Sequence, residues 1–180
     1  MTIYFRNRYR SESTRRKGFD YSWPCSCFIT ICTKNREPLF GEIITCSDNQ
    51  KNIISQKMVL NIYGEIVKDC WYDLPNHYEY IKLDAFSVMP EHVHGIIIIE
   101  NPLDGRKYHG LPEFIRAFKS FSSRRISEID ISKKSRIWHN GYYDHIIRSH
   151  DELETIRHYV IKNPDNWGRS HLPHIGNHIL

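Results

Sequence analysis

Apolar positions recur along the chain with two periods, and the period separates the strands that we expect from the helices. Runs rich in β-branched and aromatic residues predict strands over residues 28–33, 80–88, 92–99 and near 143–147. Apolar residues at helical spacing predict helices over residues 58–74, 111–129 and 149–163. Residues 34–52 follow neither period, and we expect a loop there with room for one short strand pair.

The order of these elements is strand, helix, strand, strand, helix, strand, helix. It indicates an α+β fold, a ferredoxin-like sandwich in which helices pack on one face of a mostly antiparallel sheet. Residues 89–91 join the second and third strands as a hairpin turn. The last helix begins at Ser149, and Glu152 three residues later completes the pattern of a capping box. Pro164 ends that helix.

The length of 180 residues suits one domain. We place this domain at residues 19–165, after a basic, flexible arm at 1–18 and before a tail at 166–180. No apolar run approaches the roughly 18 residues of a membrane span, and the N-terminus lacks the apolar core of a secretory signal. We therefore expect a cytoplasmic protein without a membrane partner, whose five cysteines are reduced thiols.

Positive charge is concentrated in two segments, although the formal net charge is only +4. Residues 1–17 contain six basic residues and one acid, and residues 112–136 contain seven basic residues and three acids. Such segregation is typical of a protein that binds a polyanion, while each run alone is also typical of a solvated surface. The best candidates for phosphate contacts are Arg116, Lys119, Arg124 and Arg125 on the predicted helix and Arg15, Arg16 and Lys17 in the arm.

Two histidines open the third predicted strand. Side chains alternate along a strand, so His92 and His94 point to one face while Val93 points to the other. Two imidazoles on one face of a rigid strand form half of a metal site. Two polar residues at the end of a strand give the same pattern, and it does not decide between these interpretations by itself.

A tyrosine borders the apolar stripe of the last helix. The stripe consists of Leu153, Ile156 and Val160, and Tyr159 and Asn163 lie together along one edge of it. The two polar side chains are therefore expected where the helix meets the sheet. A tyrosine at such a border is commonly a packing residue with a hydrogen-bonded hydroxyl, so its position alone does not indicate catalysis.

The imidazole pair and the phenol make chemical sense together. A divalent metal on two neutral imidazoles and one amide oxygen keeps open positions for phosphate oxygens, and it withdraws charge from a scissile phosphate. A phenol with a pKa of ~10 needs such help to attack at neutral pH. Attack by Tyr159 would leave a covalent phosphotyrosine and a free hydroxyl on the other DNA end, which is a reversible transesterification.

Short sequence motifs along most of the chain resemble those of a known protein family. They are YSWP at 21–24, FITICTKNR at 28–36, LFG at 39–41, NIYGEIV at 61–67, VMPEHVHG at 88–95, FKS at 118–120, Trp138, YYDHIIR at 142–148 and IRHYVIKNP at 156–164. With these motifs the chain resembles the single-tyrosine HUH endonucleases and, among them, the REP-associated tyrosine transposases.

The resemblance implies a ferredoxin-like nuclease domain with His92 and His94 as metal ligands and Tyr159 as the nucleophile on a C-terminal helix. It implies Asn163 as the third ligand, where the related insertion-sequence transposases have glutamine. The implied cofactor is Mg²⁺ or Mn²⁺, and the implied substrate is single-stranded DNA with palindromic, hairpin-forming repeats. We expect a nucleoid-associated transposase and endonuclease that is a monomer or a homodimer.

Other residues and other functions fit parts of the same pattern. Tyr142 and Tyr143 are alternative nucleophiles, and His139 and His145 could reach the site, although packing roles are favoured for all four. A non-catalytic module that stacks nucleic-acid bases on its histidines and aromatic residues is one alternative function. A metal-dependent phosphoesterase that activates water is another.

Overall fold

The computed structural model describes residues 4–5, 8–9, 20, 23–48, 53–100, 109–134 and 137–167. Its central sheet has four antiparallel strands in the order β6-β7-β3-β8. These strands are β3 (Cys25–Cys32), β6 (Ile81–Met89), β7 (His92–Ile99) and β8 (Tyr143–Ile147). In chain order the sheet therefore runs second, third, first, fourth, which is the split β-α-β arrangement of the expected ferredoxin-like fold.

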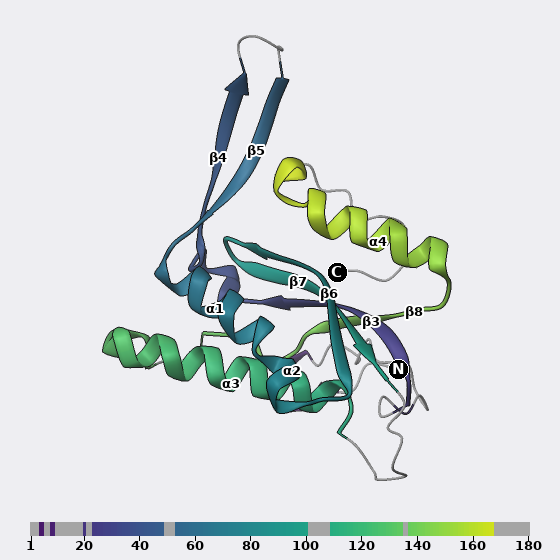
Figure 1. Cartoon of the computed structure of the whole chain (residues 1–180). Helices are drawn as coiled ribbons and strands as arrows, with labels where there is room; N and C mark the ends of the chain where they lie inside the picture. Colours follow the sequence, from purple (N-terminus) through teal and green to yellow (C-terminus); the bar gives the residue numbers. More distant parts are fainter. Residues whose placement is uncertain are drawn as a thin grey trace.

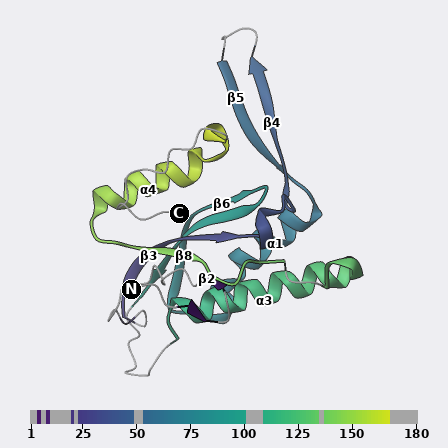
Figure 2. The same cartoon turned by 180° about the vertical axis from the view of Figure 1, so that it is seen from behind.

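Helices cover both faces of this sheet (Figures 1 and 2). The helices are α1 (Ile62–Tyr72), α2 (Leu74–His77), α3 (Leu111–Ile129) and α4 (His150–Lys162). The first three pack on one face, as expected, and share a core with alternate residues of β3 and β7 such as Ile29 and Val93. The opposite residues of the same strands, Phe28 and Ile96, pack against Ile156 and Val160 of α4. The last helix thus occupies the second face, because its apolar stripe needs apolar partners that only the other side of the strands supplies.

The structure corrects the prediction for the segment between β3 and the first helix. Residues 34–52 were expected to be mainly loop, but β4 (Gly41–Asp48) pairs with β5 (Ile53–Leu60) in a long separate hairpin. The predicted helix over 58–74 begins late, because its first residues belong to β5 and Asn61 is the N-cap. The Asn61 side chain accepts hydrogen bonds from the backbone N–H groups of Tyr63 and Gly64, which fixes the start of α1.

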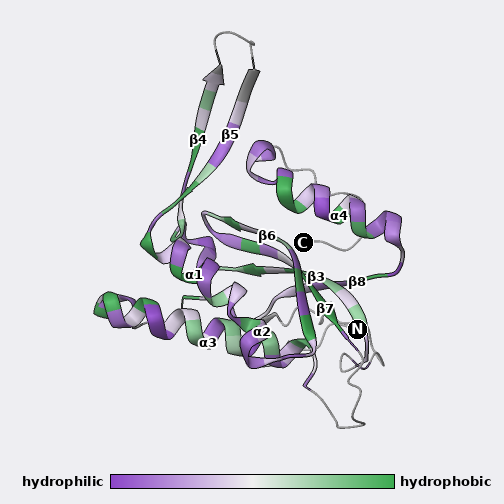
Figure 3. Ribbon diagram, viewed as in Figure 1, coloured by the Kyte–Doolittle hydropathy of each residue, from purple (hydrophilic) through white to green (hydrophobic). Residues whose placement is uncertain are grey.

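The remaining boundaries agree closely with the apolar pattern. β7 and α3 have the predicted limits, and β8 lies where the final strand was expected. Ser149 caps α4 through Glu152 N–H, but the Glu152 carboxylate accepts from Arg148 N–H instead of closing the second half of a capping box. Hydrophilic residues cover much of α4 outside its buried stripe (Figure 3).

Part of the predicted arm and tail lies outside the described residues. In the arm, β1 (Tyr4–Phe5) pairs with β2 (Arg8–Tyr9), while Arg15, Arg16 and Lys17 are not described. All five cysteines lie in the described part and are free thiols. No helix within the described ranges is long and apolar enough to cross a membrane.

The packing of Trp71 against β7 gives a test of the fold. A Cβ atom at Gly95 would lie 2.6 Å from Trp71 Cη2, and Trp71 is fully buried. We expect Gly95→Ala to lower the free energy of unfolding by about 1–3 kcal/mol through overpacking. Gly141→Ala is the control, because its nearest neighbours would be 3.7 Å away, at His139. Urea denaturation measures both variants, and equal stabilities would contradict this account of the core.

Candidate active site

Helix α4 covers one face of the central sheet (Figure 1). The two histidines of β7 point to this face, because the His94 ring meets the Tyr159 ring of α4 and His92 lies beside His94. Val93 between them is fully buried in the core on the other face. The Nε2 atoms of His92 and His94 lie 3.0 Å apart, and the ring centroids lie 4.5 Å apart. The two imidazoles therefore converge on one point, as strand alternation predicts.

Thr30 on β3 orients one of the imidazoles. It is the register partner of His94, and its Oγ1 lies 2.8 Å from His94 Nδ1. Phe28 lies on the same face of β3 and stacks on the His94 ring at a centroid distance of 5.5 Å. Because Nδ1 is occupied by the hydroxyl, Nε2 is the nitrogen that remains to bind a metal.

Burial keeps both imidazoles neutral at physiological pH. It lowers the pKa of His92 to about 4, and the positive charge of Arg36 adds to the effect. It lowers the pKa of His94 well below its ordinary value, with His92 and Arg36 as smaller causes. A neutral imidazole keeps the lone pair that a metal ligand needs, so the pair requires no deprotonation before it binds a metal.

Helix α4 brings Tyr159 to the same point. Its hydroxyl lies 3.4 Å from His94 Nε2, and the two rings are 5.3 Å apart. The Tyr159 ring also meets Phe28 edge to face at 6.0 Å. The phenol of the chain thus faces the imidazole pair of the same chain, and the structure brings these sequence-predicted site residues together.

Asn163 acts directly on this phenol. It is the C-cap of α4, one turn after Tyr159, and it is buried. Burial raises the pKa of Tyr159, and a hydrogen bond with the Asn163 side chain opposes the rise. An amide N–H that donates to the phenolic oxygen favours the phenolate. The amide oxygen is a separate atom, so the same side chain can still offer it to a metal.

The donor atoms of the imidazole pair fit a divalent ion. Two neutral imidazoles present their Nε2 atoms 3.0 Å apart, so both could bind one ion. No group of three or more His, Cys, Asp or Glu side chains in the described part of the chain could hold a metal. The other ligands would therefore be oxygens of an amide, of water or of the substrate.

Two residues outside the predicted set border the histidines. The ring of Trp167, in the predicted tail, stacks on His92 with centroids 6.0 Å apart. Arg36 bonds the carboxylate of Glu91, the residue before His92, at 2.8 Å. Both lie at short 3₁₀ helices, η3 (Pro164–Asn166) and η1 (Lys34–Arg36), whose placement apolar periodicity does not reveal. Thr30 could have been found, because pairing β3 with β7 sets it beside His94.

The alternative site residues have other partners. Tyr143 is half-buried on β8 and meets Phe28 edge to face at 6.3 Å, and its pKa is raised by burial. Tyr142 lies beneath the Lys119 amine, 5.8 Å from it. The Gly141 N–H group donates to His139 Nδ1 at 3.2 Å. His145 Nε2 lies 2.7 Å from the Glu152 carboxylate. These contacts direct the four side chains to groups other than the imidazole pair.

The predicted phosphate-binding residues of α3 lie on the opposite side of the sheet from the histidines (Figure 1). Arg116 is paired with Glu113, and Arg125 with Asp73 at 3.1 Å. Arg124 lies over the Phe121 ring at 5.6 Å. The Lys119 amine donates to the backbone carbonyls of His139 and Gly141, at 2.9 and 2.8 Å. The structure thus does not join these residues to the catalytic candidates.

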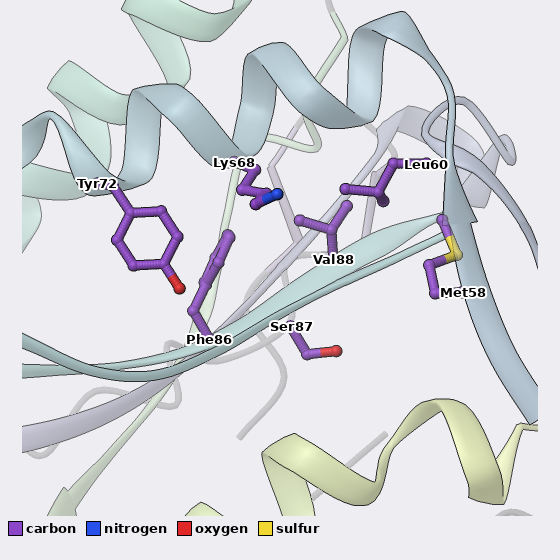
Figure 4. A pocket seen from close by; sticks show the side chains of 7 residues that line it. All are labelled: Met58, Leu60, Lys68, Tyr72, Phe86, Ser87 and Val88. Carbon is purple, nitrogen blue, oxygen red and sulfur yellow. The ribbon is translucent and has the colours of Figure 1, made fainter.

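A pocket lies between the free edge of β6 and helix α1, on the face of the sheet opposite the histidines (Figure 4). Its volume is about 210 Å³, and it is lined by Met58, Leu60, Lys68, Tyr72, Phe86, Ser87 and Val88. Ser87 is the register partner of His94, and its side chain points away from the other lining residues, toward α4. Phe86 stacks on Trp71 at 4.5 Å, and the ring edge of Tyr72 packs nearby at 5.9 Å.

Comparisons with known proteins identify the family of the chain. The sequence profile of the family described as "Transposase IS200 like" matches residues 21–163, which include the imidazole pair, Tyr159 and Asn163. A protein of Haemophilus influenzae described as uncharacterized is 33% identical over 190 aligned positions, covering 95% of this chain and 97% of that protein.

The fold also has a solved counterpart. The structure of a REP-associated tyrosine transposase bound to a REP hairpin superimposes with a TM-score of 0.56 and 16% identity. The match covers 84% of this chain and 72% of that one, and at this identity it supports the fold alone. Because the family profile covers well over half of the sequence and the Haemophilus relative extends along nearly all of it, the chain belongs to the IS200-like transposase family.

Proposed function

We propose that this chain cleaves and rejoins single-stranded, hairpin-forming DNA through a covalent phosphotyrosine at Tyr159, with Mg²⁺ or Mn²⁺ on His92 and His94. One observation carries the proposal: the Tyr159 hydroxyl lies 3.4 Å from the Nε2 atom of a buried, neutral imidazole pair. A transposase must break and rejoin DNA strands. In the described residues this is the place where a nucleophile and candidate metal ligands meet.

The proposed step exchanges one phosphate ester for another. The Tyr159 oxygen bonds to phosphorus while the bond between phosphorus and one deoxyribose oxygen breaks. The phenol loses a proton and the leaving deoxyribose oxygen gains one, which leaves a free hydroxyl. The hydroxyl of another strand can attack the phosphotyrosine in the reverse sense, and this releases the tyrosine and joins the DNA.

The chain's own residues prepare the nucleophile and the ligands. A hydrogen bond between the Asn163 side chain and Tyr159 opposes the rise in the Tyr159 pKa that burial causes. The contact between Thr30 Oγ1 and His94 Nδ1 holds the imidazole ring in the orientation in which Nε2 faces the phenol. The Phe28 ring packs against the rings of His94 and Tyr159 and shields them from water. A divalent ion, when bound, would draw charge from the scissile phosphate.

A pocket on the other face of the sheet from the histidines offers contacts to unpaired DNA. The solved counterpart is bound to a REP hairpin, and a hairpin has an unpaired loop. The pocket at the β6 edge is smaller than the roughly 300–1,000 Å³ of drug-sized sites, so it suits a single ring. Tyr72 and Phe86 offer aromatic surface to a base, and Lys68 offers charge to a phosphate. This lining supports a nucleic-acid substrate, and it also fits the non-catalytic binding module.

We expect Tyr159→Phe to abolish a covalent adduct that the wild-type protein forms. The substrate is a hairpin with a single-stranded flank, incubated with Mn²⁺, and the adduct is detected by denaturing gel electrophoresis. DNA binding should stay within about twofold, because the ring and its packing remain. Tyr143→Phe is the matched control and should retain the adduct. An adduct that persists in the Tyr159 variant would place the nucleophile elsewhere, and cleavage without an adduct would favour the water-using phosphoesterase.

We expect His92→Ala and His94→Ala each to weaken Mn²⁺ binding in the absence of DNA by at least about tenfold. Isothermal titration calorimetry measures the affinity directly, and His139→Ala is the control. Because burial lowers the pKa of His92 to about 4, wild-type binding should be lost only as the pH falls toward that value. A midpoint near the ordinary histidine pKa, or equal affinities in all variants, would refute these ligands.

We expect neutral substitution of α3 arginines to weaken hairpin binding without affecting metal binding. Their ion pairs with Glu113 and Asp73 are exposed and contribute at most about 1 kcal/mol, so the guanidinium groups can exchange them for phosphates. Arg124→Gln combined with Arg125→Gln should reduce the slope of log affinity against log salt by about one for each phosphate that is no longer neutralised. An unchanged slope would remove α3 from the DNA-binding surface, and a loss limited to one hairpin sequence would indicate base readout.

A further inference from the structure

Strand β6 contains a bulge directly opposite α4. Its register with β7 shifts between Leu83, which pairs with Ile97, and Phe86, which pairs with Gly95. Asp84 and Ala85 therefore both stand opposite Ile96. Two consecutive residues in the place of one lose the usual alternation. As a result, Ala85 packs in the α4 core cluster and Asp84 also reaches α4.

Asp84 forms a two-point contact with Arg157 of α4. Arg157 Nε donates to one carboxylate oxygen at 2.8 Å, and Nη2 donates to the other. The Ala85 N–H group donates to the same carboxylate at 2.7 Å, which fixes its orientation from the strand side. Only 14% of the Asp84 side chain is exposed, so this contact is more shielded than the ion pairs of α3. The Arg157 guanidinium holds the pKa of Asp84 below its usual range.

Arg157 and Tyr159 flank the buried stripe of α4 on opposite sides. At about 100° per residue, two positions along a helix are about 160° apart around its axis. Ile156 and Val160, between them, are completely buried. Apolar packing has little directional preference, so the stripe alone permits rotation of the helix. A two-point hydrogen bond on one flank removes that freedom and sets the position of the side chain on the other.

We propose that Asp84 and Arg157 are positioning residues for the nucleophile, and that the β6 bulge serves to aim Asp84 at the helix that carries Tyr159. The inference rests on the proposed function, because it assigns the ion pair a role in phosphotyrosine formation. A displacement of the nucleophile by about 1 Å can slow such a reaction by about 100-fold. Disruption of the two-point contact should therefore slow the chemical step and leave DNA binding unchanged.

The test compares Asp84→Asn, Arg157→Lys and the charge exchange Asp84→Arg with Arg157→Asp. Adduct formation is measured in a single turnover at saturating hairpin DNA, and the dissociation constant is measured separately. We expect the two single variants to slow the rate by about 10- to 100-fold with the dissociation constant within about twofold. Arg157→Lys keeps the charge but loses the planar fork, so it separates positioning from attraction of DNA. The charge exchange should restore part of the rate.

Lys82→Gln is the matched control, because it breaks an ion pair of the same strand, with Glu100, that does not involve α4. Its rate should equal that of the wild-type protein. Wild-type rates in the Asp84 and Arg157 variants would overturn the inference, and so would a parallel loss of rate and affinity, which would make Arg157 a DNA contact.

Hydrogen exchange separates this inference from the proposed function. Backbone amides of α4 should exchange several-fold faster in Asp84→Asn than in the wild-type protein or in Lys82→Gln. This measurement needs no DNA and no activity. If the wild-type protein forms no adduct, the proposed function fails, and the exchange rates still decide whether the ion pair holds the helix. Unchanged exchange in α4 would overturn the positioning role.

Discussion

The alternation of side chains along β7 is the constraint on which the rest of the structure depends. β7 is one of two central strands, so hydrogen bonds to β6 and β3 fix its register on both sides. Val93 and Ile97 complete the core under α1 and α3, and His92 and His94 must then face α4. A shift of one residue would turn the imidazoles into the core under α1 and α3 and turn the valine toward α4. The stability of the sheet and the placement of the candidate ligands are therefore one requirement.

Burial has opposite effects on the two kinds of group in the site. It favours the neutral imidazole, which is the form that binds a metal, and it disfavours the phenolate, which is the form that attacks. The hydrogen bond from Asn163 offsets part of the second effect within the chain. In the proposed reaction the remaining activation of Tyr159 must come from positive charge that arrives with the metal and the substrate.

The spacing of apolar residues predicted most helices and strands correctly. α3 and the stripe of α4 were predicted because their apolar residues follow a single period and one neighbouring layer buries them. The strand of the histidines was predicted because its continuous apolar run has the length of a strand buried on both faces. The start of α1 was misplaced because Met58 and Val59 continue its helical spacing by coincidence, while pairing with β4 makes them a strand. The contact between Asp84 and Arg157 could not be predicted, because a bulge cancels the alternation from which side-chain direction is inferred. The face of the sheet that α4 covers is the one where apolar strand residues are not already packed against α1 and α3. These residues can be identified only when the order and register of the strands are known.

Residues 148–149 are the whole connection between β8 and α4. Two residues span at most about 7 Å, so they cannot carry the helix to a neighbouring molecule while the strand stays paired. Exchange of the helix between copies would require the end of β8 to leave β3. In the arrangement described, each polypeptide holds its own phenol against its own imidazoles. The proposed reaction would therefore need no second copy of the chain to complete the site.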